Sequence, residues 1–323
     1  MDMIEVSELA KTYQTKQGPV EAVRNVSFRV GSGEIVGFLG PNGAGKTTTM
    51  RMLTTLLRPS GGNATIAERD LRRDPAGVRL RIGYVSQTGG GRPMAAVRDD
   101  LVFQGRLYRL PQAQAEARAD ELIHDLELGD VAARMNVTLS GGQKRRVDVA
   151  LGLVHQPKVL FLDEPSANLD PQSRLTLWRH IRRLRDEHGS TVFLSTHNLD
   201  EADNLCDRIL IIRKGEIIAE DSPGQLKARA GTDKIAVDVT PDQTGAAQAA
   251  LAAEPSITSV SVAGATMTLN CHHADRMLTT VLVTLAQAGV TVESVRVVRP
   301  TLDDVFLAMA ASPVAASPDP ISV

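Results

Sequence analysis

The stretch Gly40-Pro-Asn-Gly-Ala-Gly45-Lys46-Thr47 has the form GxxxxGK[ST]. It follows an apolar run at residues 35–39, which predicts a strand, and it precedes a segment from about Lys46 that favours a helix. The glycines let successive backbone N–H groups turn toward an anion, and a helix N-terminus adds the positive end of its dipole. We therefore interpret the stretch as a phosphate-binding loop in preference to a ligand-free turn. Lys46 would reach the β- and γ-phosphates of a nucleotide, and the Thr47 hydroxyl would ligate Mg²⁺.

A second apolar run, at residues 159–162, ends in two carboxylates, Asp163 and Glu164. Taken alone, this pattern also fits an ordinary strand followed by a surface turn. Ligands of α/β sheets bind at the carboxyl ends of the strands, however, and a phosphate loop that holds Mg²⁺ needs an acidic anchor. Asp163 suits the metal, and Glu164 suits the general base if the fold places it against the attacking water.

Composition and charge narrow the class of protein. The chain has 323 residues, enough for two domains, and its 42% hydrophobic and 23% charged residues exclude a collagen-like, coiled-coil or wholly disordered chain. A net charge of -2 gives no global electrostatic reason to expect a nucleic acid or an anionic membrane as partner. Cys206 and Cys271 lie too far apart in the sequence for a CxxC site or a disulfide framework. Without a long apolar run or a secretory signal, we expect a chain that stays inside the cell.

The order of predicted elements indicates two domains and a tail. Predicted strands, among them residues 35–39, 159–162 and 191–195, alternate with helices through residues 1–230, which is typical of an α/β domain. A polar linker near residue 230 marks the boundary. Residues 231–310 predict strand, helix, two strands, helix and strand, the ferredoxin-like α+β order, followed by a helix at residues 302–310. This small domain carries 4 basic and 8 acidic side chains, which weighs against nucleic-acid binding. Residues 311–323, rich in proline, are expected to form a disordered tail.

The five residues Leu139-Ser140-Gly141-Gly142-Gln143 lie between the phosphate loop and Asp163. Ser140 and Gln143 have the S-x-x-Q form of a capping box, so the segment alone could simply begin a helix. In this order along the chain, with the loop before them and the carboxylates after them, the five residues resemble the signature motif of ATP-binding cassette (ABC) ATPases.

The resemblance extends over about 220 positions, since further motifs of that family occur in their expected order. Gln87 matches the Q-loop glutamine, which in the family touches Mg²⁺ and links the site to the transmembrane partner. Ser166-Ala-Asn-Leu169-Asp170 matches the D-loop, and His197 matches the switch histidine that contacts the γ-phosphate. Tyr13 matches the aromatic residue that stacks on adenine, although an ordinary core or surface tyrosine also fits there.

The resemblance implies three sets of site residues. Catalytic roles fall to Glu164, His197, Gln87 and Lys46. Metal ligation falls to Thr47, Gln87 and Asp163. The residues expected to contact ATP are Tyr13, Gly40, Pro41, Asn42, Gly43, Ala44, Gly45, Lys46, Thr47, Thr48, Ser140, Gly141, Gly142 and Gln143.

Within the superfamily, the chain resembles ATP-binding subunits of the daunorubicin-resistance type. The small C-terminal domain and its ending, Arg299-Pro-Thr-Leu-Asp-Asp-Val-Phe-Leu307, carry this narrower resemblance. Three features depart from the family pattern: Asn168 replaces a common glycine, Asn198-Leu199 replaces an aromatic pair, and residues 88–92 form a glycine-rich insert after Gln87.

The resemblance implies a P-loop NTPase of ABC type, with a mixed sheet and a helical subdomain, plus the ferredoxin-like domain. It implies an ATP hydrolase that forms a head-to-tail dimer with a second copy of itself, in which Ser140, Gly141 and Gly142 of one copy cap the γ-phosphate held by the other. It further implies a separate transmembrane permease, contacted through residues 87–110 at the cytoplasmic face of the cell membrane, export linked to antibiotic resistance, and no nucleic-acid partner.

Three alternative functions also fit parts of the sequence. The chain could be the ATPase subunit of an importer, which the exporter-type C-terminal domain disfavours. It could be a soluble ABC ATPase acting on DNA or ribosomes, but such relatives carry a long coiled-coil insert or two cassettes, and neither occurs here. It could also sense ATP without hydrolysing it, which the presence of Glu164, Gln87 and His197 disfavours.

Overall fold

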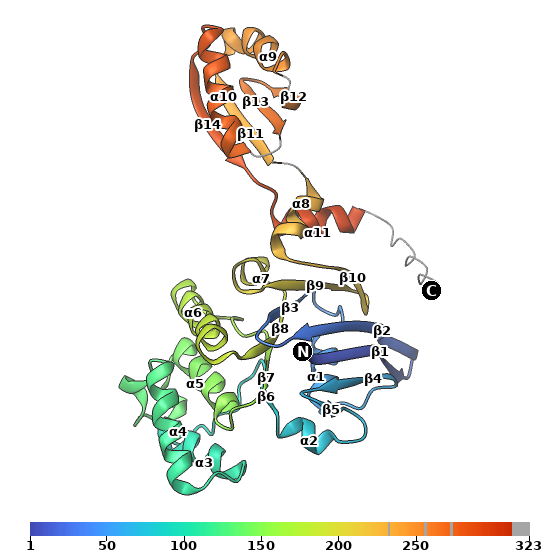
Figure 1. Cartoon of the computed structure of the whole chain (residues 1–323), viewed down its shortest axis with the longest axis vertical. Coiled ribbons are helices and arrows are strands. Elements are labelled where there is room, and N and C mark those ends of the chain that lie inside the picture. Colours follow the sequence, from blue (N-terminus) through green and yellow to red (C-terminus); the bar gives the residue numbers. More distant parts are fainter. Residues whose placement is uncertain (232, 255–256, 272–273, 312–323) are drawn as a thin grey trace. The chain divides into compact units, whose positions relative to one another are not determined.

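The computed structural model describes residues 1–231, 233–254, 257–271 and 274–311. The chain forms two compact units, Met1–Pro223 and Gly224–Val323 (Figure 1). The units divide at the start of helix α8 (Pro223–Ala230), whereas the sequence predicts the boundary near the last residue of that helix. Residues 312–323, which make up nearly all of the expected tail, lie outside the described residues.

A six-stranded sheet in the order β10-β9-β3-β8-β7-β6 forms the centre of the first unit. Its strands are β3 (Ile35–Leu39), β6 (Ile82–Val85), β7 (Val159–Asp163), β8 (Thr191–Thr196), β9 (Arg208–Arg213) and β10 (Glu216–Asp221). All pairs are parallel except β9 with β10. Every residue of β3, β7 and β8 is buried, as expected for strands covered on both faces. The strands predicted at residues 35–39, 159–162 and 191–195 are thus confirmed.

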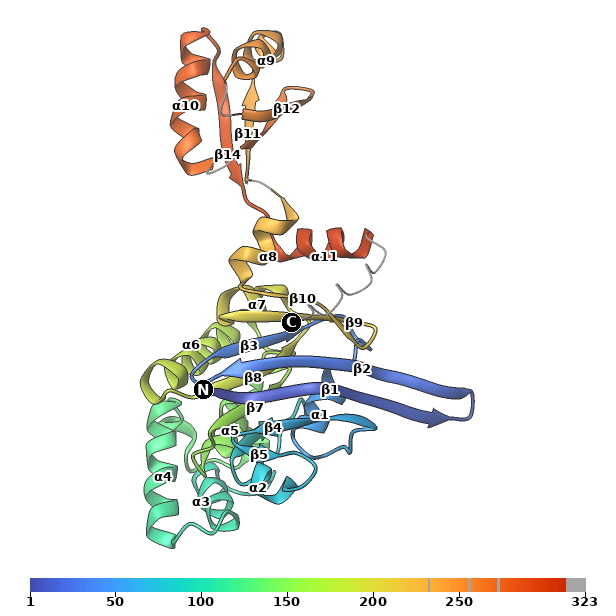
Figure 2. The same cartoon turned by 45° about the vertical axis from the view of Figure 1, so that its right-hand side comes forward.

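An antiparallel sheet in the order β2-β1-β4-β5 packs against the central sheet. Its strands are β1 (Asp2–Thr15), β2 (Gly18–Gly31), β4 (Gly61–Ile66) and β5 (Arg69–Asp70). Figure 2 shows β1 and β2 as a long hairpin. Phe28 of this sheet stacks on Phe193 of β8, which also contacts Phe38 and Phe161, so aromatic rings fill the core between the two sheets.

Helices cover the remaining faces of the first unit. Their bounds are α1 (Lys46–Leu53), α2 (Pro75–Arg79), α3 (Val97–Leu107), α4 (Gln112–Asp125), α5 (Gly141–Leu153), α6 (Pro171–His188) and α7 (Leu199–Leu205). Helices α3, α4 and α5 pack together as the expected helical subdomain (Figure 1). Helix α5 also packs against β6 and α6, which places its buried face close to the edge of the central sheet.

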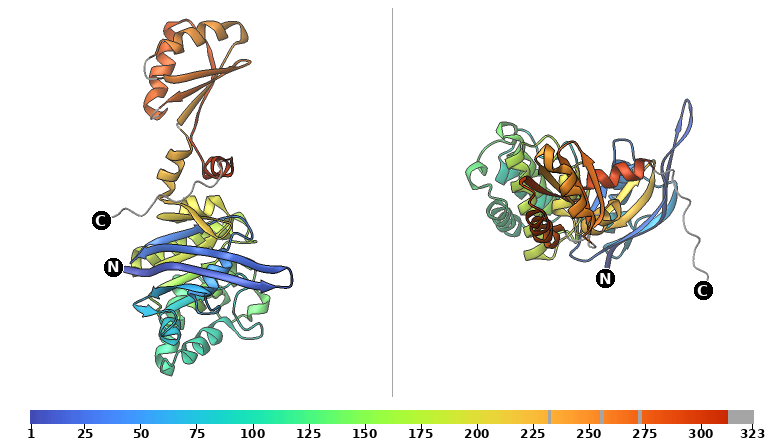
Figure 3. Two further views of the ribbon diagram at one scale, coloured as in Figure 1. Left: turned by 90° about the vertical axis from the view of Figure 1, so that its right-hand side faces the viewer. Right: turned by 90° about the horizontal axis from the view of Figure 1, so that it is seen from above.

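The second unit contains the ferredoxin-like arrangement predicted from the sequence. Its elements are β11 (Asp233–Val239), α9 (Thr244–Ala252), β12 (Ile257–Ala263), β13 (Thr266–Cys271), α10 (Ala274–Gln287), β14 (Val292–Val298) and α11 (Leu302–Ala311). The sheet is antiparallel in the order β12-β13-β11-β14, and α9 and α10 share one hydrophobic core with it (Figure 3). Among the described residues, no helix combines the length and the apolar composition needed to cross a membrane.

The aromatic core of the first unit generates a test of stability. Phe193 is fully buried, and its ring centroid lies 5.4 Å from that of Phe28 and 5.6 Å from that of Phe38. We expect Phe193→Ala to lower the free energy of unfolding by about 3–5 kcal/mol, because the lost contacts and the cavity both destabilise the fold. In a urea titration, the fluorescence of Trp178, the only tryptophan, reports the unfolding of the first unit alone. Leu175→Ala, at a largely exposed position of α6, is the control and should change the value by less than about 0.5 kcal/mol.

Candidate active site

The phosphate-binding loop leaves the buried end of β3 and enters α1 at Lys46. Gly43 and Gly45 have φ angles of 80° and 110°, which residues with a side chain rarely adopt. At Gly45 a Cβ atom would also lie 2.6 Å from the carbonyl oxygen of Ala22. The glycine at this position is therefore required both by the backbone angle and by the close approach of β2.

The Lys46 ammonium closes the loop on itself. Its Nζ donates to the carbonyl oxygens of Gly40 at 2.7 Å and Pro41 at 3.1 Å, and it lies 3.8 Å from Glu164 Oε1. The side chain is only 4% exposed. Burial lowers the pKa of Lys46, while the negative charges of Glu164 and Asp163 partly oppose that shift. A buried positive charge therefore lies at the position where the sequence predicts phosphates.

Asp163 lies at the end of β7 between two hydroxyl groups. Thr47 Oγ1 lies 3.5 Å from Asp163 Oδ1, and the hydroxyl of Ser195 donates to the same oxygen at 2.5 Å. Hydroxyl and carboxylate oxygens are the hard donors that Mg²⁺ takes in proteins. The side chains of Thr47 and Asp163 thus fit the metal role predicted for them.

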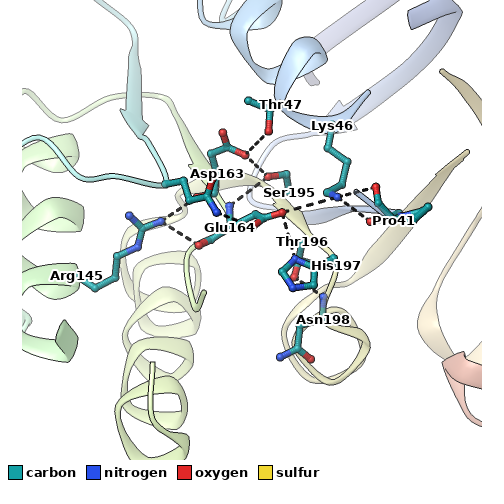
Figure 4. A network of polar contacts seen from close by, with 12 residues as sticks. Pro41, Lys46, Thr47, Arg145, Asp163, Glu164, Ser195, Thr196, His197 and Asn198 are labelled. Atoms are coloured by element: carbon teal, nitrogen blue, oxygen red, sulfur yellow. Dashed lines mark hydrogen bonds and ion pairs between the residues drawn. The ribbon is translucent and has the colours of Figure 1, made fainter. Parts of the chain in front are cut away.

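The Glu164 carboxylate is the point on which the other polar side chains converge (Figure 4). Gln87 Nε2 donates to its Oε2 at 3.0 Å, and His197 Nδ1 lies 3.2 Å from its Oε1, the oxygen that also faces Lys46. The backbone of Glu164 has a φ of 46°, a strained value for a residue with a side chain. Its N–H donates to Ser195 Oγ at 3.2 Å. Backbone conformation and side-chain contacts together place this carboxylate beside the loop.

A cavity of about 610 Å³ opens between the loop and Glu164. Predicted site residues that line it are Asn42, Gly43, Gly45, Lys46, Thr47, Thr48, Gln87, Glu164 and His197. Ala22, Ala167 and Asn168 also line it, although none of them is among the predicted site residues. Tyr13 is not among the lining residues, and its side chain, in the β1–β2 hairpin, is 37% exposed.

The signature residues also do not line this cavity. They form the N-terminus of α5, where Ser140 Oγ accepts from Gln143 N at 3.3 Å and Gln143 Oε1 accepts from Ser140 N at 3.0 Å. This is the capping box expected from the S-x-x-Q spacing. At Gly142, a Cβ atom would lie 2.3 Å from Ser173 Oγ, so a side chain there would collide with α6. Within one chain the signature residues are therefore separated from the cavity that holds Lys46 and Glu164.

Sequence reasoning missed two polar residues of the site. Ser195 is the second-last residue of β8 and pairs with Asp163 of β7. Its position near the carboxyl end of an apolar run was the sequence feature that could have identified it. Arg145 is 6% exposed and donates to the carbonyl oxygens of Pro165 at 2.7 Å and Asp163 at 2.9 Å. The sequence feature that could have identified Arg145 is its spacing. It lies four positions before the apolar Val149, which places both residues on the helix face that packs inward.

Two of the departures from the family pattern have structural explanations. Asn168 has a φ of 60°, and asparagine is among the few residues besides glycine that adopt this left-handed conformation readily. Asn198 caps α7, since its side chain accepts from the N–H of Glu201 at 3.3 Å. Both positions therefore keep the backbone geometry that their turns require.

Each unit of the chain is similar to a known protein family. Residues 23–167 match the family described as ABC transporter, and residues 222–310 match the family described as ATP-binding protein DrrA1-3-like, C-terminal domain. The daunorubicin resistance ATP-binding protein DrrA3 of Streptomyces coeruleorubidus is 42% identical over 296 residues, which cover 91% of this chain and 92% of that protein. The linearmycin resistance ATP-binding protein LnrL of Bacillus subtilis (strain 168) is 32% identical over 310 residues, covering 94% and 97%.

A solved structure resembles the first unit in fold. The dimeric post-hydrolysis state of the ATP-binding cassette MJ0796, bound to ADP and Pi, aligns with a TM-score of 0.63 at 26% identity. The alignment covers 68% of this chain and 98% of that one.

The buried ammonium of Lys46 generates a test of nucleotide binding. We expect Lys46→Ala to weaken ATP affinity at least about tenfold, because a charge-assisted hydrogen bond contributes roughly 1.5–3 kcal/mol. Isothermal titration with a non-hydrolysed ATP analogue measures this affinity. Lys158→Ala is the matched control, since Lys158 is half exposed and lies outside the cavity. Equal affinity of Lys46→Ala and the unmodified chain would contradict the assignment.

Proposed function

This chain belongs to the ABC transporter family, and we propose that it binds and hydrolyses ATP in the cavity between Lys46 and Glu164. The observation that carries this assignment is the convergence of Gln87, His197 and Lys46 on the carboxylate of Glu164, beside a phosphate-binding loop. The chain acts as the ATPase subunit of an export system. We assign nucleotide binding to residues 1–230 and a separate C-terminal domain to residues 231–310.

The loop and Lys46 bind the phosphates. The N–H groups at the start of α1 and the Lys46 ammonium present positive charge to the cavity, and the burial of Lys46 strengthens its electrostatic interactions. Thr47 and Asp163, with Gln87, would hold Mg²⁺, which neutralises developing negative charge when it is bound.

Glu164 then acts as the general base. One of its oxygens accepts a proton from the attacking water, whose oxygen bonds to the γ-phosphorus as the bond from that phosphorus to ADP breaks. Gln87 and His197 orient the carboxylate, and ADP and phosphate are the products. Catalysis therefore depends on positioning and on electrostatic stabilisation, which are the main contributions that proteins make to phosphoryl transfer.

A second copy of the chain completes the site. The separation of Ser140, Gly141 and Gly142 from the cavity supports this, because the N–H groups at a helix N-terminus can bind an anion that another molecule holds. The similarity to a dimeric ATP-binding cassette bound to ADP and Pi supports the same assembly. ATP would then join two copies head to tail, and hydrolysis would release them.

Closure of the dimer acts on a separate transmembrane permease at the cytoplasmic face of the membrane. The surface around residues 87–110 contacts this permease. The relatives named for daunorubicin and linearmycin resistance support export of a drug-like cargo. The same relatives disfavour the importer alternative. Tyr13 is assigned to the adenine on the family resemblance alone.

The base assignment predicts the behaviour of Glu164→Gln. We expect this variant to bind ATP about as tightly as the unmodified chain but to turn over at least about a hundredfold more slowly, because general-base catalysis contributes roughly 10²–10⁴-fold. Steady-state phosphate release and size-exclusion chromatography with ATP measure turnover and an accumulated dimer. Glu68→Gln, at a half-exposed surface position, is the control. Unmodified turnover in Glu164→Gln would refute the role, and turnover that persists in EDTA would refute the Mg²⁺ assignment.

The proposed permease predicts which proteins copurify with the tagged chain from detergent-solubilised membranes of its native host. We expect mass spectrometry to identify a multi-spanning membrane protein, enriched relative to a purification of a tagged unrelated cytoplasmic ATPase. Recovery only with ribosomal or DNA-repair proteins would refute the export function while leaving the ATPase chemistry intact.

A further inference from the structure

The glycine-rich insert that follows Gln87 is anchored by a buried acid on the signature helix. Asp148 of α5 is 6% exposed, and its Oδ1 accepts from the N–H of Gly90 at 2.9 Å. Gly89 has a φ of 77°, and a Cβ atom there would lie 2.5 Å from Asp148 Oδ2. The insert therefore needs glycine at residue 89 to bring its backbone against this carboxylate.

The other end of the same loop is anchored by the same helix. Arg145 Nη1 donates to the carbonyl oxygen of Ser86, the residue before Gln87, at 2.6 Å. Arg145 and Asp148 are three positions apart on α5, so they lie on one face of the helix. One helix thus holds the backbone on both sides of Gln87, because Arg145 donates to the carbonyl oxygen of Ser86 and Asp148 accepts from the N–H of Gly90.

Arg145 also holds the backbone that carries Glu164. Its Nη2 donates to the carbonyl oxygens of Asp163 at 2.9 Å and Glu164 at 3.3 Å, and its Nε donates to that of Pro165 at 2.7 Å. These bonds cross the point where Glu164 adopts its strained φ of 46°. A single guanidinium therefore joins the segment before Gln87 to the segment that aims the Glu164 carboxylate.

Both anchors are buried charges that the fold keeps in place. Burial lowers the pKa of Arg145, and the charges of Asp148, Glu201 and Asp163 oppose that shift. Burial raises the pKa of Asp148, and the N–H of Gly90 and the charge of Arg145 oppose it. Buried charges are costly unless every donor and acceptor is satisfied, so movement of α5 away from these partners would be unfavourable.

We propose that Arg145 and Asp148 are positioning residues that couple the signature helix to the catalytic side chains of the same chain. The N-terminus of α5 carries Ser140, Gly141 and Gly142, so engagement of that end by a nucleotide held on a second copy sets the position of the whole helix. Through their hydrogen bonds, Arg145 and Asp148 make the positions of Gln87 and of the Glu164 backbone depend on the position of α5. The inference rests on the proposed function, and it makes the contacts of α5 with residues 86–90 a determinant of turnover and not of ATP affinity.

The test compares variants that break the contact between Asp148 and the backbone of residues 89–90, one by changing the acid and one by changing the loop. Asp148→Ala removes the acceptor, and Gly89→Ala forces the loop away from it. We expect each variant to lower kcat about tenfold with KM changed less than about twofold, because small misplacements of catalytic groups reduce rates steeply. The double variant should be no slower than either single variant, since both break the same contact. Asp148→Asn keeps an acceptor for Gly90 and should restore most of kcat.

Hydrogen–deuterium exchange of the peptide covering residues 86–92 supplies a second readout. We expect faster exchange there in Asp148→Ala and Gly89→Ala, while the fluorescence of Trp178 in the absence of urea still reports a folded first unit. Gly129→Ala is the matched glycine control, because Gly129 is exposed and has open space around it. Arg145→Lys keeps the charge but not the fork of donors, and it should lower kcat further because Glu164 also loses its anchor.

Unmodified kcat in Asp148→Ala and Gly89→Ala, or unmodified exchange at residues 86–92, would overturn the inference. A parallel loss of kcat, ATP affinity and urea midpoint would also overturn it, because that combination indicates general destabilisation. If the unmodified chain neither bound nor hydrolysed ATP, the proposed function would fail, while the exchange measurement would still decide whether Asp148 anchors the loop.

Discussion

The site depends on one geometric constraint, which is that parallel strands bring their carboxyl ends to the same edge of a sheet. Leu39 pairs with Thr196, Asp163 with Ser195, and Val85 with Leu162. The residues that follow β3, β6, β7 and β8 therefore meet at one edge although they lie far apart in the sequence. The phosphate loop, the two carboxylates, Gln87 and His197 converge there because the strands are parallel and in register.

The second constraint is the cost of buried charge. Lys46, Arg145, Asp148 and Asp163 are all buried in the first unit, and each has polar partners that offset part of its desolvation. Several of these partners are backbone groups, which cannot move without moving a strand end or a loop. These hydrogen bonds thus hold the backbone around Gln87 and Glu164 in place, and catalysis by positioned groups needs such support.

Much of the fold and part of the site could be predicted because the signals are local. Apolar runs predicted β3, β7 and β8, the strand and helix order predicted the ferredoxin-like unit, and the S-x-x-Q spacing predicted the cap at Ser140. Ser195 and Arg145 were missed because their roles come from partners distant in the sequence. A buried arginine bound to backbone carbonyls leaves no pattern in the residues that supply those carbonyls.

The sequence by itself determined the chemistry available to this chain: a glycine loop with one lysine, two carboxylates after an apolar strand, and a capped helix that starts with two glycines. Residue types and short spacings suffice for that, because each motif is built from neighbours along the chain. Only the tertiary structure decided that Gln87, His197 and Lys46 share the Glu164 carboxylate, that the signature residues lie away from it, and that α5 holds both ends of the Gln87 loop. These arrangements arise from strand register and helix packing, which join segments that the sequence keeps apart.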